Sequence, residues 1–188
     1  MGVAEAVAGG ARTFVIGVAN AGGVLPESWI PHVVEAICAG MDVASGLHVR
    51  LGAVPAIAEA AREAGAALHD LRHPARAFAT GEGRKRAGLR LLAMGTDCSV
   101  GKKYAALCLE RDKRMAGFNA NFRATGQTGL LISGRGVALD AVVADFVAGA
   151  GEWLTPDADP AQWDVIEGQG RLFNPSSAGV TLGLLHGS

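Results

Sequence analysis

Two lysines follow a glycine-rich stretch near the middle of the chain, in a pattern that can hold phosphate groups. Its two glycines, Gly95 and Gly101, allow the backbone to curl so that successive amide groups point inward. The positive end of the following helix lies behind them, and the Lys102 ammonium adds a mobile charge. We therefore predict a loop that binds a nucleotide-like ligand through its phosphates. The residues assigned to this cofactor site are Gly95, Thr96, Asp97, Cys98, Ser99, Val100, Gly101, Lys102 and Lys103.

The loop departs from the usual P-loop pattern in two ways. Five residues separate its glycines where the usual pattern has four, and Lys103 stands where a Ser or Thr normally holds Mg²⁺. Neither Tyr104 nor Ala105 restores that hydroxyl. The loop can hold phosphate oxygens without its usual metal-binding hydroxyl, and we predict no metal site.

A carboxylate follows an apolar run later in the chain. Glu167 precedes Gly168-Gln169-Gly170, and an acid at the carboxyl end of a parallel strand is expected beside the phosphate loop. Glu167 could bind Mg²⁺, orient a water or accept a proton from an amine. The alternative is a carboxylate that only caps or hinges the segment. We name Glu167 as a candidate catalytic residue.

A second polar segment, residues 123–129, follows another predicted strand. It offers a guanidinium, hydroxyls and an amide, which are suited to holding a carboxylate substrate, although an ordinary polar turn has the same composition. The candidate substrate-binding residues are Arg123, Thr125, Gln127 and Thr128.

Two other side chains carry reactive groups. The Cys98 thiol lies near a helix start, where the pKa of a thiol tends to fall, so it could act as a nucleophile or simply fill space in the loop. His186 is the only histidine near the glycine-rich C-terminal segment, and we add it to the candidate catalytic residues.

The elements that must position these residues alternate between strand and helix. Apolar and β-branched runs predict strands, and apolar residues at helical spacing predict helices. The alternation favours an α/β fold with a parallel sheet covered by helices on both faces. The predicted strands are 13–18, 41–45, 66–70, 89–94, 119–123 and 163–166, and the predicted helices are 27–39, 54–64, 102–116 and 139–154. An element is still in progress over residues 179–185.

A change of composition divides the chain. We predict an N-terminal domain over residues 1–80, a glycine-rich linker over 81–88 and a P-loop domain over 89–188. The basic residues Arg84, Lys85 and Arg86 of the linker are either a solvated connection or a cationic rim for a phosphate ligand. Both ends are abrupt, so we expect a chain that is incomplete at both ends.

Composition excludes several classes of protein. The 188 residues carry a net charge of -1, which argues against a nucleic-acid binder held by bulk electrostatics. No apolar run is long enough for a membrane span, and the start lacks the basic and apolar regions of a secretory signal. We therefore expect a cytoplasmic protein that acts on a small molecule, with no nucleic-acid or membrane partner, as a homo-oligomer.

Several segments resemble known families. GTDCSVGK is similar to the phosphate loop of dethiobiotin synthetases, and IEGQG resembles the segment that carries their magnesium-binding glutamate. A fuller resemblance, to the DgcN-like family of D-glutamate N-acetyltransferases, spans nearly the whole chain. It rests on VIGVANAGG, DVASGLH, GTDCSVGKK, RATGQTG, DAVVADFVAGA, IEGQG and GVTLGLLHG.

This resemblance implies a Rossmann-like N-terminal domain followed by a P-loop domain. It also implies transfer of an acetyl group from acetyl-CoA to the amine of D-glutamate. On this reading the loop holds the pyrophosphate of coenzyme A, residues 123–128 hold the substrate carboxylates, and Glu167 deprotonates the ammonium. Two alternatives stay open: an ATP-dependent ligase or kinase that places Asp97 and Glu167 around Mg²⁺, and a non-catalytic nucleotide-binding module.

Overall fold

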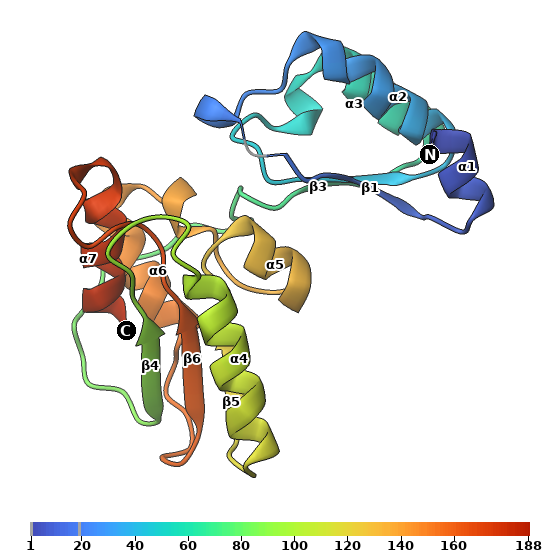
Figure 1. The fold of residues 1–188 in the computed structure, drawn as a ribbon. Helices are drawn as coiled ribbons and strands as arrows, with labels where there is room; N and C mark the ends of the chain where they lie inside the picture. Colours follow the sequence, from blue (N-terminus) through green and yellow to red (C-terminus); the bar gives the residue numbers. More distant parts are fainter. Residues whose placement is uncertain (1, 19) are drawn as a thin grey trace. The chain divides into compact units, whose positions relative to one another are not determined.

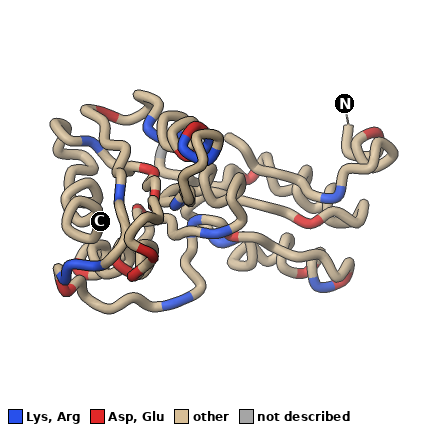
Figure 2. Tube along the Cα trace, turned by 90° about the horizontal axis from the view of Figure 1, so that it is seen from below, with Lys and Arg blue, Asp and Glu red and all other residues tan. Residues whose placement is uncertain are grey.

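The computed structural model describes residues 2–18 and 20–188. The chain divides into two compact units, Met1–His73 and Pro74–Ser188, so the predicted linker 81–88 lies inside the second unit. Figure 2 shows acidic and basic residues interspersed along both units. None of the helices in the described ranges has the length and apolar character needed to span a bilayer.

The first unit is a three-stranded parallel sheet with the order β1-β2-β3. Its helices α2 and α3 pack against each other on one side of the sheet (Figure 1). Ile16, Val33, Val43 and Ile57 form part of the core between these layers. The elements are α1 (Val3–Ala8), β1 (Thr13–Ile16), α2 (Ile30–Cys38), β2 (Asp42–Ser45), α3 (Pro55–Ala64) and β3 (Leu68–Asp70), with 3-10 turns at Ala21–Gly23, Glu27–Trp29 and Leu51–Ala53.

The second unit is another three-stranded parallel sheet, with the order β4-β6-β5. Because β6 is central, its carboxyl end lies between the carboxyl ends of the other two strands. The elements are β4 (Leu89–Ala93), α4 (Lys102–Met115), β5 (Ala120–Arg123), α5 (Gln127–Ser133), α6 (Val147–Leu154), β6 (Trp163–Glu167) and α7 (Ala178–Gly187), with 3-10 turns at Leu139–Ala141, Ala144–Phe146 and Pro175–Ser177.

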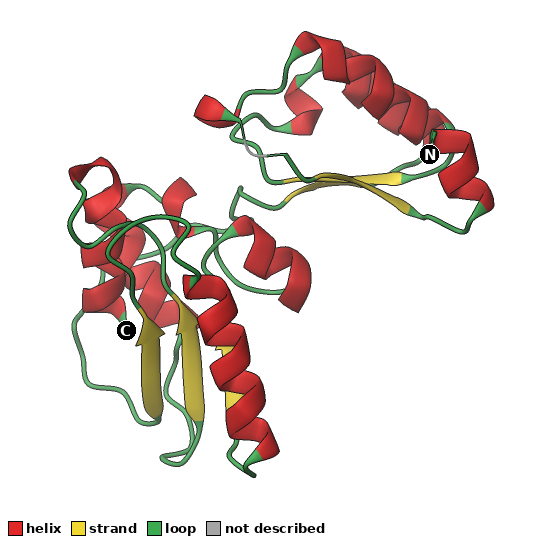
Figure 3. Ribbon diagram, viewed as in Figure 1, coloured by secondary structure: helices red, strands yellow, loops and turns green. Residues whose placement is uncertain are grey.

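Helices cover both faces of the second sheet, as the alternation predicts (Figure 3). Helix α4 packs on one face, while α6 and α7 cover the other. Val165 and Ile166 point to opposite faces of β6 and are both fully buried. Ile166 packs with Ala150 of α6 and Leu184 of α7. The central strand is therefore held from both sides, which fixes the position of Glu167 at its end.

The prediction of one helix over 139–154 is wrong in its first half. Two 3-10 turns precede α6, and Val142 and Val143 between them have non-helical backbone. The reason is that the amides of Val137 and Leu139 donate to the carbonyl oxygens of Ala124 and Thr125, after β5. These amides therefore do not donate to carbonyl oxygens four residues earlier, as they would in a helix. Val143, which a helix would place on its buried face, is 66% exposed.

Two further segments differ from the expectation. The polar segment after β5 is not only a loop, because Gln127–Ser133 forms helix α5. The element in progress over residues 179–185 is helix α7. The other predicted strands and helices are present, with ends that differ by a few residues.

Candidate functional site

The loop between β4 and α4 is closed by its own lysine. Lys102 is the first residue of α4, and its Nζ donates a hydrogen bond of 2.7 Å to the backbone carbonyl oxygen of Asp97. Ser99 and Gly101 have left-handed backbone, with φ of 57° and 95°. For Ser99 this conformation is unfavourable, and such strain is common where a backbone is shaped for a ligand.

Two glycines make room for the Lys102 stem. A Cβ atom at Gly95 would lie 3.0 Å from Cγ and Cδ of Lys102 and 2.6 Å from Cγ2 of Val100. A Cβ atom at Gly168, after β6, would lie 3.2 Å from Lys102 Cδ and would collide with the carbonyl oxygen of Ala93. The requirement at both positions is close approach, and their conformation alone does not demand glycine.

The Gly168→Ala substitution is therefore expected to destabilise the second unit. The obstacle is backbone, which cannot rotate away as a side chain can, so we expect a loss of about 3 kcal/mol in the free energy of unfolding. Urea unfolding followed by circular dichroism measures it. Gly179→Ala in α7 is the matched control, because open space surrounds that position, and it should leave stability unchanged or slightly higher. Equal stabilities for the two variants would contradict this account.

The segment after β6 braces the phosphate loop. The amides of Leu172 and Phe173 donate to the carbonyl oxygens of Gly95 and Thr96, over 3.1 and 3.4 Å. The side chain of Arg171 reaches the loop as well. Its Nε lies 3.2 Å from Oδ1 of Asp97 and 2.9 Å from Sγ of Cys98. Asp97 Oδ1 also accepts a hydrogen bond of 2.7 Å from the Cys98 amide.

Glu167 is buried at the carboxyl end of the central strand, with 4% exposure. Its Oε2 accepts hydrogen bonds from the amides of Thr125 and Gly126, at 3.0 and 3.2 Å. Its Oε1 accepts none from the described residues. Burial raises the pKa of the Glu167 carboxyl, while the two amides and the charges of Lys103 and Lys102 act in the opposite direction. The result is a more basic carboxylate than usual, with one oxygen left to receive a proton.

One cavity of about 440 Å³ connects the phosphate loop, the start of α5 and the end of β6. It brings together eight of the residues assigned from the sequence, namely Cys98, Ser99, Gly101, Lys102, Lys103, Gln127, Thr128 and Glu167. The cavity is also lined by five residues that are not among those predicted from the sequence, namely Tyr104, Gly126, Gly168, Gln169 and Gly170. Each of them lies next to an assigned residue or a few positions from one in the sequence, and this proximity is the sequence feature from which they could have been predicted.

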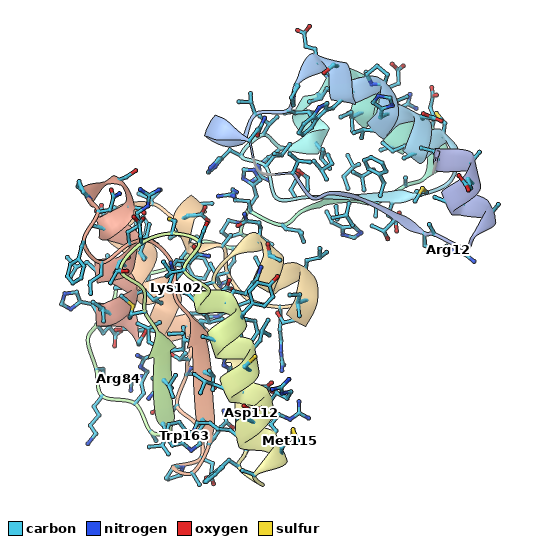
Figure 4. The ribbon with its side chains drawn as sticks, in the orientation of Figure 1. Arg12, Arg84, Lys102, Asp112, Met115 and Trp163 are labelled. Carbon is cyan, nitrogen blue, oxygen red and sulfur yellow. The ribbon has the colours of Figure 1, made fainter. Side chains whose placement is uncertain are left out.

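Other predicted residues do not line this cavity. The Thr125 side chain is fully buried, and its hydroxyl donates a hydrogen bond of 2.5 Å to the backbone carbonyl oxygen of Glu167. His186 is exposed near the end of α7. Arg84 lies beside β4 and Lys102 beyond the carboxyl end of this strand (Figure 4), and none of the basic residues 84–86 lines this cavity. Arg86 instead donates to the carbonyl oxygens of Glu152 and Thr155.

Arg123 is engaged in an ion pair. Its Nε and Nη2 each lie 2.8 Å from Oδ1 of Asp164, and the two side chains are 18% and 3% exposed. A buried carboxylate that loses its cation is left uncompensated. This arrangement gives Arg123 a structural role in joining β5 to β6.

Arg123→Ala is accordingly expected to cost about 3 kcal/mol of unfolding free energy. The double variant Arg123→Leu/Asp164→Leu is the control, because replacing both charges by apolar groups should recover most of that loss. Chemical denaturation of both variants makes the comparison. If Arg123→Ala unfolded like the wild type, the structural role would be refuted and the predicted role in binding substrate would regain its support.

Comparison with known families matches both units. Residues 77–188 match the P-loop domain of a family described as a domain of unknown function, DUF1611, and residues 2–74 match its Rossmann-like N-terminal domain. The chain belongs to the DUF1611 family. The predicted order of a Rossmann-like domain followed by a P-loop domain is thereby confirmed.

Two curated relatives of this DUF1611 chain are named D-glutamate N-acetyltransferase. One, from Pseudoalteromonas sp, is 54% identical over 186 residues, which are 99% of this chain and 56% of that protein. Another, from Tritonibacter scottomollicae, is 52% identical over 187 residues, again 56% of its length. The chain therefore spans little more than half the length of these relatives.

The DUF1611 fold is also known from a solved structure. A crystal structure of a DUF1611 family protein from Anabaena variabilis superposes with a TM-score of 0.87 at 37% sequence identity. The match covers all of this chain and 54% of that one. The predicted resemblance to the D-glutamate N-acetyltransferases thus agrees with the names of the two sequence relatives, and the solved structure agrees with the DUF1611 fold.

Proposed function

We propose that the protein transfers an acetyl group from acetyl-CoA to the amine of D-glutamate. The observation that carries the proposal is that Glu167 shares one cavity with a phosphate loop, and that only one of its two carboxylate oxygens, Oε2, accepts hydrogen bonds from the described residues. The relatives named D-glutamate N-acetyltransferase support it, since they are more than 50% identical over nearly the whole chain. That the protein is a cytoplasmic homo-oligomer stays a prediction.

The phosphate loop suits coenzyme A. Its backbone curls at Ser99 and Gly101, and Lys102 and Lys103 both line the cavity. Coenzyme A presents a pyrophosphate that must be held but not cleaved, so the loop needs positive charge and amides rather than the parts that stabilise a leaving phosphate. We assign the pyrophosphate to this loop.

The acceptor is assigned to the opposite side of the cavity. Gln127, Thr128 and Gln169 contribute amide and hydroxyl groups there, which can donate hydrogen bonds to the carboxylates of a dicarboxylic amino acid. Glu167 then faces the amine. Its free Oε1 takes a proton from the ammonium, and the raised pKa of this carboxyl makes it the stronger base.

The reaction follows as a single displacement. The deprotonated nitrogen attacks the thioester carbonyl carbon, a C–N bond forms and the C–S bond breaks. The sulfur leaves with the electron pair and takes up the proton that the attacking nitrogen loses as the amide forms, which gives N-acetyl-D-glutamate and free coenzyme A. The proton first taken by Glu167 passes to solvent. No acyl-enzyme is required, so Cys98 has no step to perform in this scheme.

The test is release of free thiol from acetyl-CoA, followed with a thiol-reactive dye. The chain is assayed with D-glutamate and with L-glutamate, and the Pseudoalteromonas relative serves as the positive control for the assay. We expect thiol release with D-glutamate and little with L-glutamate. Turnover of the relative alone, under conditions in which this chain is folded and binds acetyl-CoA, would contradict the proposal.

A further inference from the structure

P-loop domains usually hold their ligand together with Mg²⁺, so the fit of this site to that ion can be examined. The usual ligands are the hydroxyl that follows the loop lysine and an acid from a neighbouring strand. Here Lys103 occupies the hydroxyl position. No group of three or more His, Cys, Asp and Glu side chains that could hold a metal occurs within residues 2–18 and 20–188.

The two nearby acids are already engaged. Asp97 Oδ1 receives the Cys98 amide and lies 3.2 Å from the Arg171 guanidinium. Oε2 of Glu167 receives two backbone amides, and Lys102 and Lys103 line the same cavity as this carboxylate. These residues do not fit a bound Mg²⁺, because a dication would lie beside ammonium groups and compete with the partners that the acids already have.

Lys103 itself has the position of a counter-ion. It lines the cavity, and its Nζ lies 4.8 Å from the centre of the Tyr104 ring, which lines the cavity too. Its charge lowers the pKa of Glu167 more strongly than that of Lys102 does. Lys102 donates to a carbonyl oxygen inside the loop. No carboxylate pairs with Lys103 in the described part of the chain, so its charge is available to a ligand.

We propose that Lys103 takes the place of the divalent cation, so that the site binds a diphosphate group without Mg²⁺. The identity of the diphosphate as that of coenzyme A rests on the proposed function. Two negative charges then meet two ammonium groups, Lys102 within the loop and Lys103 at the first turn of α4. Charge-assisted hydrogen bonds of this kind are about twice as strong as neutral ones, and they need no metal hydration shell to be removed.

The experiment is isothermal titration of the chain with coenzyme A, in excess EDTA and again in millimolar Mg²⁺. We expect the two dissociation constants to agree within about twofold, and Lys103→Ala to weaken binding by about tenfold or more in both buffers. Lys103→Arg keeps the charge and should retain most of the affinity. Lys85→Ala removes the same charge from an exposed position in the basic segment and should bind as the wild type does. Thermal unfolding of each variant shows that it is folded.

Two results would overturn the inference: affinity that rises about tenfold on adding Mg²⁺, or a folded Lys103→Ala variant that binds as tightly as the wild type. Parallel titrations with inorganic pyrophosphate and the thiol-release assay separate this inference from the proposed function. Turnover of D-glutamate that depends on Mg²⁺ removes the inference and leaves the function. Metal-independent, Lys103-dependent binding of pyrophosphate without acetyl transfer removes the function and leaves the inference.

Discussion

Glu167→Gln is expected to lower kcat for acetyl transfer to D-glutamate by about 10²–10⁴-fold, because general acid–base catalysis typically accelerates a reaction by that factor. The amide keeps the shape of the carboxylate, and its oxygen can still accept from Thr125 and Gly126. It cannot take a proton from the substrate ammonium. Steady-state thiol release at saturating acetyl-CoA measures the loss.

The pH dependence of the rate is a second test of Glu167 as the base. Burial raises the pKa of Glu167, so the active carboxylate form is lost as pH falls through that raised value, and the acid limb of the rate profile should lie above the pH expected for an ordinary glutamate. The limb should be absent in Glu167→Gln. An acid limb that survived the substitution would assign the base to another group.

Stability separates a catalytic loss from unfolding. A carboxyl whose pKa is higher in the folded state binds its proton more tightly there, so its contribution to stability is present at low pH and is lost as pH rises through the folded pKa. The neutral amide avoids that loss, and Glu167→Gln should be at least as stable as the wild type at neutral pH.

Glu152→Gln is the matched control for Glu167→Gln. Glu152 is likewise held by two backbone amides, those of Glu82 and Gly83, but it lies in α6 and lines no part of the cavity. Its substitution should leave kcat unchanged. Equal losses in the two variants would mean that the effect is structural.

Lys102→Ala is expected to raise the dissociation constant for coenzyme A by about 100-fold, because it removes both a charged donor to phosphate and the group that closes the loop onto Asp97. The effect should shrink as ionic strength rises. Isothermal titration at low and high salt measures it, with Lys85→Ala as the control for net charge. Unchanged affinity in a folded variant would place the pyrophosphate elsewhere.

The parts of the site that the sequence could predict are those governed by local rules. An apolar strand, a glycine loop, a lysine and a helix follow one another between Leu89 and Met115, so the phosphate loop needs no knowledge of distant residues. Glu167 is predictable as well, because acids at the carboxyl ends of parallel strands meet at one edge of the sheet. Its hydrogen bonds to Thr125 and Gly126 were not predictable, since they depend on β5 lying beside β6.

The failures come from long-range contacts. Asp164 lies opposite Asn121, and Arg123 is two residues further along the same face of β5, so the ion pair exists only in this register. Residues 139–146 have helical spacing of apolar groups, yet Leu139 hydrogen bonds to the backbone beyond β5. Helix α5 is not predicted because Gly126 and Gly129 indicate a turn. In the structure, Gly129 lies inside the helix and is glycine for a different reason: a Cβ atom there would overlap Oε2 of Glu167.

The brace that Leu172 and Phe173 form with the phosphate loop has a consequence for binding kinetics. A loop that is already hydrogen bonded to a neighbouring segment loses little conformational entropy when a ligand arrives, so association should need no slow ordering step. Differences in affinity among ligands and loop variants should then appear mainly in the dissociation rate, as residence time. Because that segment continues directly from Glu167, the proposed base and the brace of the phosphate loop lie on one continuous stretch of chain.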